Sequence, residues 1–120
     1  MLEYRFFKKY RLLHRQEFDE VFRQRESAAD GMVVVYARRN QLDVSRVGLV
    51  VSRKIGSAVV RNRWKRLMRE AFRLNRNVLP ASLDIVVISR GGEPNLKSLE
   101  HSLKRLVARI NKRLVDGISH

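Results

Sequence analysis

Apolar and polar positions along the chain form stretches that are typical first of a helix and then of strands. In "RQEFDEVFRQRE" the apolar residues recur at i, i+3 and i+4, which predicts a short amphipathic helix over residues 14–26. The following "SAADG" is expected to end this helix. Two apolar, β-branched runs come next, Met32–Arg39 and Arg46–Arg53, and the polar "NQLDVS" between them predicts an antiparallel hairpin.

The second half of the chain predicts two longer helices around one buried strand. Ser57 can cap a helix that runs to about Asn75, because Gly56 interrupts the preceding strand and no proline intervenes. Residues 84–90, "DIVVISR", predict a buried strand, and the helix before it is long enough for parallel pairing. Asn95 then caps a last helix. The apolar positions of that helix trace one face: Leu96, Leu99, Leu103, Leu106, Val107, Ile110 and Leu114.

The predicted order is therefore α, β, β, α, β, α, with room for one further short strand if one of the first runs is split. A chain of 120 residues with 44% hydrophobic residues has the size and composition of one folded domain. We expect a single domain over residues 1–120, with a basic arm at 1–13 and a flexible tail at 116–120.

Charge narrows the class of partner. The chain has 26 Lys and Arg against 12 Asp and Glu, a formal charge of +14, and the segment Arg46–Arg76 carries most of the excess. Such a charge on a small domain indicates a polyanionic partner. With no cysteine, no secretory signal and no run of about 18 apolar residues, we expect a soluble protein of the cytoplasm.

The basic helix that follows Ser57 has two different faces. At 100° per residue, one arc holds the apolar residues that would dock it on a sheet: Trp64, Leu67, Met68, Ala71 and Phe72. The opposite side holds Lys65, Arg66, Arg69 and Arg73. Like charges at i and i+4 repel one another, which favours an anionic partner over simple solvation. The strand end and helix N-terminus at "SRKIGS" add Arg53 and Lys54 where phosphate binds readily.

The chain shows no pattern of a self-sufficient active site. Glu17 and Glu20 share a helix face, where solvation is the simplest interpretation. His14, His101 and His120 lack metal-ligand spacing and are expected at the surface. There is no phosphate-binding glycine loop and no zinc-finger spacing. These residues indicate a binding protein that needs a partner for chemistry.

The stretch "RVGLVVSRKIGSAVVRNRWKRLMREAF", residues 46–72, resembles the protein component of bacterial ribonuclease P, whose hallmark is "RNR" followed by a basic helix. The resemblance also includes "RLLHRQEFDEVF", "VVYARR" and "LDIVVISR", and covers about Arg11 to Leu114. Three departures are small: Arg53 replaces the usual lysine, Trp64 takes a normally aliphatic position, and "SRGG" replaces an ending with alanine, arginine and proline.

This resemblance implies an α+β two-layer sandwich, of the kind found in the second domain of a small-subunit ribosomal protein. It further implies three helices, an αβββαβα-like order and a left-handed βαβ crossover, against the right-handed rule. The family removes the 5′ leader of precursor tRNA as a ribonucleoprotein in which a large RNA is the catalyst. Magnesium is then expected to be held mainly by the RNA, with no protein metal site and no obligate protein partner.

By the same resemblance, site residues fall into two groups. Contacts to the catalytic RNA are expected from Arg61, Asn62, Arg63, Lys65, Arg66 and Arg69. A cleft for the single-stranded leader is expected to be lined by Phe18, Phe22, Tyr36, Arg53 and Lys54. The i, i+4 spacing of Phe18 and Phe22 fits core packing equally well. Tyr36 is a better cleft residue, because its neighbours point to the other face of the strand.

Two other functions remain open from the residues alone. A ribosomal or other basic RNA-binding protein without a role in cleavage has the same charge pattern. A regulator that binds double-stranded DNA ranks last, because no helix-turn-helix pairing is visible.

Overall fold

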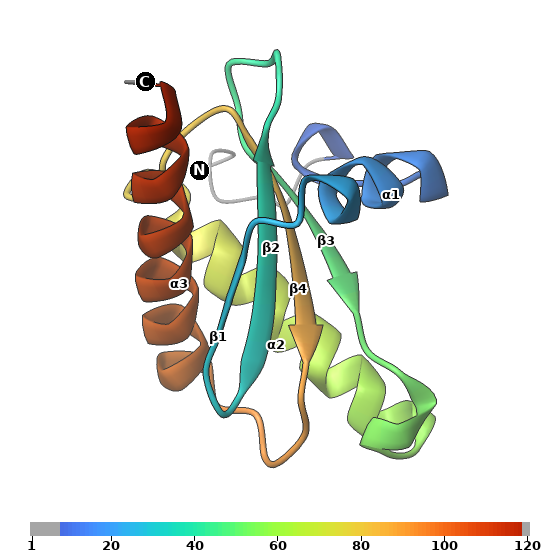
Figure 1. Cartoon of the computed structure of the whole chain (residues 1–120). Helices are drawn as coiled ribbons and strands as arrows, with labels where there is room; N and C mark the ends of the chain where they lie inside the picture. Colours follow the sequence, from blue (N-terminus) through green and yellow to red (C-terminus); the bar gives the residue numbers. More distant parts are fainter. Residues whose placement is uncertain (1–7, 119–120) are drawn as a thin grey trace.

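The computed structural model describes residues 8–118, and the order of its elements is αβββαβα with two short 3-10 helices (Figure 1). The helices are η2 (Lys8–Tyr10), α1 (Arg15–Gln24), η3 (Arg53–Ile55), α2 (Ala58–Asn75) and α3 (Leu96–Ile118). The strands are β1 (Ser27–Ala29), β2 (Val33–Arg39), β3 (Arg46–Val50) and β4 (Leu83–Ser89). The α+β architecture expected from the sequence is confirmed.

The four strands form one mixed sheet in the order β1-β2-β4-β3. β4 pairs antiparallel with β2 and parallel with β3, so the last strand of the chain lies between the second and third. The predicted hairpin of β2 and β3 is therefore wrong. The two runs are strands as expected, but β4, which is buried on both faces, takes the place between them.

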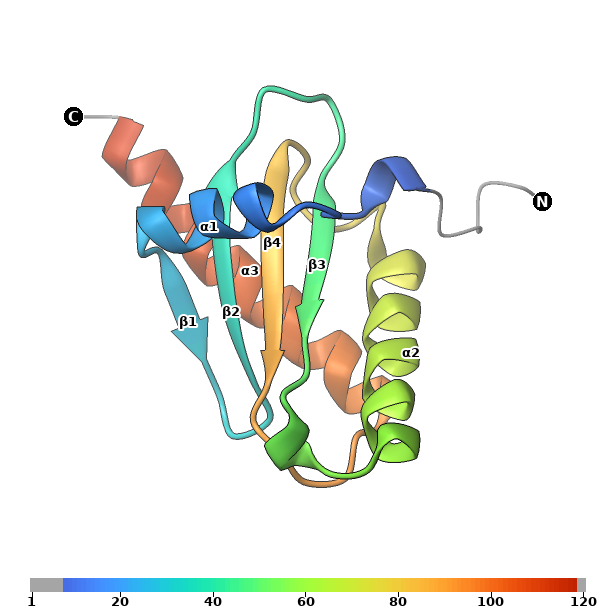
Figure 2. The ribbon, with the colours of Figure 1, turned by 90° about the vertical axis from the view of Figure 1, so that its right-hand side faces the viewer.

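The connection β3–α2–β4 is the left-handed crossover that the resemblance implied. Figure 2 views the sheet from the α1 side, with β3 and β4 both pointing down and β4 to the left of β3. α2 joins them on the opposite face, where it packs with α3 in the main core. In this view the chain leaves β3, passes behind the sheet through α2 and enters β4 on the left. This path is a left-handed crossover, whereas nearly all parallel βαβ connections are right-handed.

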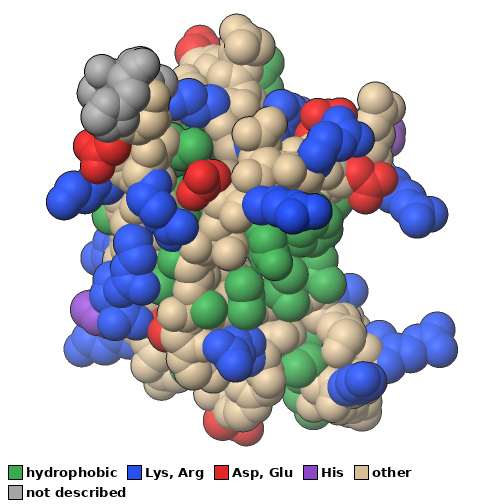
Figure 3. Space-filling model, in the orientation of Figure 1, with side chains coloured by type: hydrophobic (Ala, Val, Ile, Leu, Met, Phe, Trp, Pro, Cys, Tyr) green, Lys and Arg blue, Asp and Glu red, His purple; other side chains and the backbone are tan. Residues whose placement is uncertain are grey.

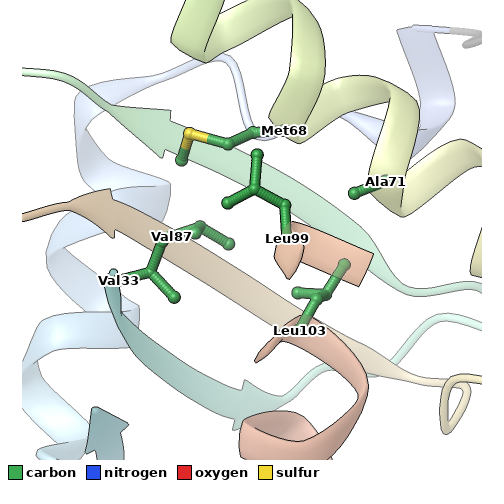
Figure 4. Close-up of a pocket in the computed structure, with 6 residues that line it drawn as sticks. All are labelled: Val33, Met68, Ala71, Val87, Leu99 and Leu103. Atoms are coloured by element: carbon green, nitrogen blue, oxygen red, sulfur yellow. The ribbon is translucent and has the colours of Figure 1, made fainter. Parts of the chain in front are cut away.

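The main core lies between the sheet and the helices α2 and α3. β2 alternates buried and partly buried residues, and its buried side faces this core through Val33, Val35 and Ala37. Six apolar side chains from β2, β4, α2 and α3 point toward one another across a small gap in this core (Figure 4): Val33, Met68, Ala71, Val87, Leu99 and Leu103. This gap is a feature of core packing and offers no polar group to a ligand.

Most predicted boundaries agree with the structure. Ser57 caps α2, its hydroxyl oxygen accepting a hydrogen bond from the N–H of Val60, and α2 ends at Asn75 as predicted. Asn95 Oδ1 accepts from the N–H of Ser98 at the start of α3. The third strand that the resemblance implied before α2 is present, but its position at β1 was not predicted, because "SAADG" indicates only the end of α1.

The two predicted terminal segments are in part regular structure. In the basic arm, Leu12 is buried and its N–H donates to the carbonyl oxygen of Val47, while Arg11 bridges to the same residue of β3. In the predicted tail, residues 116–118 continue α3. Residues 1–7 and 119–120 of these segments, with His120, lie outside the described residues.

Candidate nucleic-acid interface

The sheet face opposite α2 and α3 is only partly covered, because α1 crosses it at one end. Beyond α1, three aliphatic residues at one level of the pairing register, Val34, Ile88 and Val50, lie side by side on β2, β4 and β3. All three are only partly buried, and Val50 and Ile88 pack against a small cluster under α1. Figure 3 shows the result as a hollowed apolar strip with cations above and below it. We call these three residues, together with Tyr36, the sheet cleft.

The aromatic residues of α1 form the end wall of the sheet cleft. Phe18, Phe22 and Tyr36 are each partly buried and pack against the buried Val21 and Val86. The rings of Phe22 and Tyr36 meet edge to face, with centroids 5.0 Å apart. The core-packing interpretation of the α1 phenylalanines is thus confirmed in part, since the rings pack in this second cluster and still reach the surface. Their contact with the leader stays a prediction.

Phe18 occupies space on β3 that is free because residue 48 is a glycine. A Cβ placed on Gly48 would come within 2.5 Å of the Phe18 ring, so the ring lies directly on the backbone of the strand. Tyr36, Val86 and Gly48 occupy one level of the register across three strands. The small residue at the end of that row therefore allows α1 to lie close to the sheet.

A buried charged row holds α1 in place. Asp84 on β4 is fully buried and lies between Arg38 of β2 and Arg46 of β3. Arg46 Nε and Nη2 donate to the two oxygens of Asp84 at 2.9 and 2.8 Å, and its Nη1 donates to Glu17 Oε2 of α1 at 2.8 Å. Asn40 Nδ2 also donates to Asp84, at 2.8 Å. Two planar charge-assisted contacts from one guanidinium fix the helix to the sheet.

Glu17 also closes the N-terminus of α1. Its Oε1 accepts from the backbone N–H groups of Leu13 and His14 at 2.8 and 2.9 Å. Burial alone would raise the pKa of the Glu17 carboxyl, but these N–H groups and the charge of Arg46 lower it overall. Solvation is therefore the wrong interpretation of Glu17. It fits Glu20 better, since that side chain lies at the surface and pairs with the exposed Arg23.

The other end of the sheet cleft is bordered by η3 and the start of α2. Arg53 and Lys54 are both exposed on η3, directly after β3. Arg61 is partly buried, and its Nε donates to the carbonyl oxygen of Gly56 at 3.2 Å. Gly56 has φ 154°, a left-handed value that favours glycine at this corner. The corner thus gathers three cations beside the apolar strip.

The outer face of α2 presents the remaining predicted RNA contacts. Asn62, Arg63, Arg66 and Arg69 are exposed, whereas Trp64 is fully buried as core. The charge of this face is less uniformly positive than the sequence indicated. Arg63 pairs with Glu93 at 2.8 Å, and Arg73 pairs with Glu70. Both side chains of the Arg63 pair are largely exposed, so this contact is weak and open to exchange for phosphate.

Lys65 differs from its neighbours on α2, since it is partly buried and faces the β3 edge. With Arg69 and Arg11 it borders a recess of about 180 Å³ whose other walls include Phe18 and Gly48. Burial, together with the nearby charge of Arg11, lowers the pKa of Arg69. The recess therefore joins the basic face of α2 to the aromatic wall under α1.

The structure thus brings the two predicted groups of residues onto one continuous surface. The sequence missed Val34, Val50 and Ile88, although the alternation within the strands could have assigned them to the face of Tyr36. Among residues 8–118 no three acidic or histidine side chains lie close enough to hold a metal ion, and His14 and His101 are exposed. No helix within that range is long and apolar enough to cross a membrane.

Comparison with known proteins points to one family. The family model described as "Ribonuclease P" matches residues 6–111. The chain is 37% identical over 103 residues to the ribonuclease P protein component of Lachnoclostridium phytofermentans, which covers 84% of this chain and 88% of that protein. It is 46% identical over 85 residues to the ribonuclease P protein component of Thermotoga maritima, with 71% and 73% covered.

Solved structures show the same fold. The ribonuclease P protein of Staphylococcus aureus superimposes with a TM-score of 0.73 at 33% identity, covering 86% of this chain and 95% of that one. The protein from Thermotoga maritima, solved with 1-(4-fluorophenyl)-2-thiourea, gives a TM-score of 0.64 at 39% identity, with 88% and 94% covered. Because sequence and fold agree over most of the length of both partners, the chain belongs to the ribonuclease P protein family.

Proposed function

We propose that this ribonuclease P protein binds the catalytic RNA through α2 and the single-stranded 5′ leader of precursor tRNA in the sheet cleft. Bound in this way, it promotes endonucleolytic removal of the leader and gives the mature 5′ end of the tRNA. Family membership replaces the alternatives of a ribosomal protein and of a DNA-binding regulator. The observation that carries the proposal is the apolar strip left open between α1 and η3.

The chemistry of the sheet cleft suits single-stranded RNA. Aromatic side chains stack on unpaired bases, at about 1–3 kcal/mol per base, and the aliphatic strip offers an apolar surface beside them. Cations at the η3 corner, Arg53, Lys54 and Arg61, lie where the phosphates of such a strand would run. Stacking and phosphate contact tolerate many base sequences, which suits leaders of different tRNAs.

The protein itself acts as a positioning subunit. Its residues hold the leader and the catalytic RNA, while the RNA carries out hydrolysis and holds magnesium. The exposed guanidinium groups of Arg63 and Arg66 are suited to bidentate contact with RNA phosphates. By neutralising phosphates, these cations lower the concentration of magnesium that the assembled RNA requires.

Reconstitution tests the proposal directly. Purified protein is added to the cognate catalytic RNA, and cleavage of precursor tRNA is measured at low magnesium. We expect a much faster reaction than with the RNA alone, and a difference that shrinks as magnesium is raised. Equal rates with and without protein across the whole magnesium range would contradict the proposal.

A variant of the sheet cleft tests where the leader binds. Tyr36→Ala removes the ring that meets Phe22, and we expect leader-bearing precursor tRNA to bind the holoenzyme about 5- to 150-fold more weakly, as loss of one stacked base predicts. Mature tRNA should bind as before. Tyr36→Phe keeps the ring and is the matched control. Equal weakening for both tRNAs would show damage to the fold and no leader contact.

A further inference from the structure

The outer face of α3 carries an excess of positive charge that neither the sheet cleft nor α2 uses. Within Leu96–Ile118 there are six Lys and Arg residues against two acids. α1, which covers the other face of the sheet, has two cations and three acids. The excess on α3 is therefore second to that of the basic helix α2, which has six Lys and Arg residues and one acid.

Two of the six cations fasten α3 to the rest of the fold. Arg105 donates to Asp30 at 2.9 Å, and Arg113 donates to the carbonyl oxygen of Ser27 at 2.6 Å. The other four are exposed, and we call them the α3 ridge: Lys97, Lys104, Arg109 and Lys112. His101, also exposed, lies between the first two.

The α3 ridge is held rigidly in an extended line. The opposite face of the helix is fixed in the main core by buried residues, among them Leu99, Leu106 and Ile110. At 1.5 Å per residue, the ridge from Lys97 to Lys112 is about 22 Å long. Like charges held along such a line repel one another, and only an extended anion relieves the repulsion along its whole length.

The α3 ridge cannot share the ligand of the sheet cleft. α1 and α3 cover opposite faces of the sheet (Figure 1), and cations with a histidine line the α3 side of the surface in Figure 3. A leader strand on the α1 face is separated from α3 by the whole sheet. The ridge therefore requires a second anionic segment.

We propose that the α3 ridge binds the phosphate backbone of a double-helical segment of the catalytic RNA, at a place distinct from the segment that α2 contacts. The inference rests on the proposed function only in that the chain assembles with that RNA. α3 contains no Phe, Tyr or Trp, so it has no platform for unpaired bases, in contrast to the sheet cleft. Lysines contact phosphates as point charges without reading sequence, which suits the regular backbone of an RNA helix.

A triple variant, Lys97→Gln with Lys104→Gln and Lys112→Gln, tests the ridge. Binding of full-length protein to the catalytic RNA is measured over a range of salt concentrations, and the RNA is footprinted in the complex. We expect the slope of log affinity against log salt to fall by about two to three units, as loss of three phosphate contacts predicts. Protection should disappear from one helical segment of the RNA, and the segment protected by α2 should stay protected.

Two matched variants separate a contact from an effect of net charge. Lys97→Arg, Lys104→Arg and Lys112→Arg together keep the charge and should keep the slope. Lys8→Gln, Arg15→Gln and Arg23→Gln together remove the same charge from exposed positions on η2 and α1, and should change the slope far less. Equal effects of the two glutamine triples would overturn the proposal.

The outcomes also distinguish this inference from the proposed function. If wild-type protein fails to bind the catalytic RNA or to stimulate cleavage, the proposed function fails. If wild-type protein does both and the α3 triple shows an unchanged slope and footprint, only the α3 ridge is refuted. Weakened binding confined to precursor tRNA, or to anionic lipid vesicles, would assign the ridge to another partner and likewise overturn the proposal.

Discussion

The contact between Gly48 and Phe18 decides how closely α1 approaches the sheet. Gly48 is buried on β3, and the Phe18 ring occupies the space that a side chain there would need. The ring in turn borders both the cluster under α1 and the recess beside Lys65. Because residue 48 has no side chain, Phe18 can contribute both to the cluster under α1 and to the recess beside Lys65.

Gly48→Ala is expected to destabilise the fold by about 1–3 kcal/mol, because the added Cβ would lie 2.5 Å from the Phe18 ring and overpack a tight contact. Urea denaturation of the variant and the wild type measures the difference. Gly31→Ala is the matched control, since a Cβ at Gly31 meets nothing within 4 Å and should cost little. An equally small effect at both glycines would show that Phe18 can move away freely.

At the scale of elements, Asp30 joins the β1–β2 turn to α3. Its Oδ1 accepts from the backbone N–H groups of Met32 and Val33, and its Oδ2 accepts from Ser102 and Arg105 of α3. Burial would raise the pKa of the Asp30 carboxyl, yet these four donors outweigh it and lower the pKa to about 2. The ionised carboxylate is thus part of what holds the α3 ridge in place.

The lowered pKa of Asp30 predicts a pH dependence of stability. A carboxyl whose pKa is lower in the folded state stabilises the fold above its unfolded pKa, near 4, and that contribution is lost as the pH falls toward 2. The free energy at stake is about 2 kcal/mol. Urea denaturation between pH 5 and pH 2 measures it, and Asp30→Asn should show a correspondingly shallower decline than the wild type. Parallel curves for the two proteins would contradict the assignment.

Elements were predictable from the sequence where local chemistry decides them, and so was the parallel pairing of β4 reached through α2. The antiparallel partner of β2 was not predictable. α2 begins and ends as predicted because Gly56 and the Ser57 cap fix its start within a few residues. The β2–β3 hairpin was wrong because the strand that separates them, β4, is decided by contacts more than 30 residues away. β1 was missed because "SAA" has little strand propensity and pairs only along one edge.

The candidate site, too, has a part that could be predicted from the sequence and a part that could not. Its cations and aromatic residues are visible as residue types in a motif, so the resemblance could assign them. The role of Glu17 could not be seen, because its partner Arg46 is 29 positions away and is itself oriented by Asp84, a further 38 positions along the chain. A buried charge network of this kind is defined by the fold and leaves no local pattern.

At the scale of the whole molecule, a formal charge of +14 acts on every part of the fold. The ion pairs Arg23–Glu20, Arg63–Glu93 and Arg113–Glu26 lie at the surface, and each of these contributes little. Repulsion among the remaining cations opposes the compact state and extends over about one Debye length, 10 Å at 0.1 M salt. Screening by salt should therefore increase the stability of the fold, because it weakens the repulsion among cations more than it weakens the ion pairs.

We expect the midpoint of urea denaturation to rise when NaCl is raised from about 0.1 M to about 1 M, where the Debye length falls to about 3 Å. The α3 triple glutamine variant, with three charges fewer, should show a smaller rise. A midpoint that falls with added salt would mean that the ion pairs outweigh the repulsion.

The position of β4 in the sheet also governs the order in which the molecule can assemble on the ribosome. β1 and β2 can pair as soon as both are made, but β3 lacks its partner strand until β4, which ends at Ser89, leaves the exit tunnel. At roughly 5–20 residues per second, a synthesised β3 waits for several seconds with an unpaired edge. During that interval the basic helix α2 also lacks most of the surface on which it packs. The sheet face that is proposed to bind the tRNA leader is therefore completed only late in the synthesis of the protein.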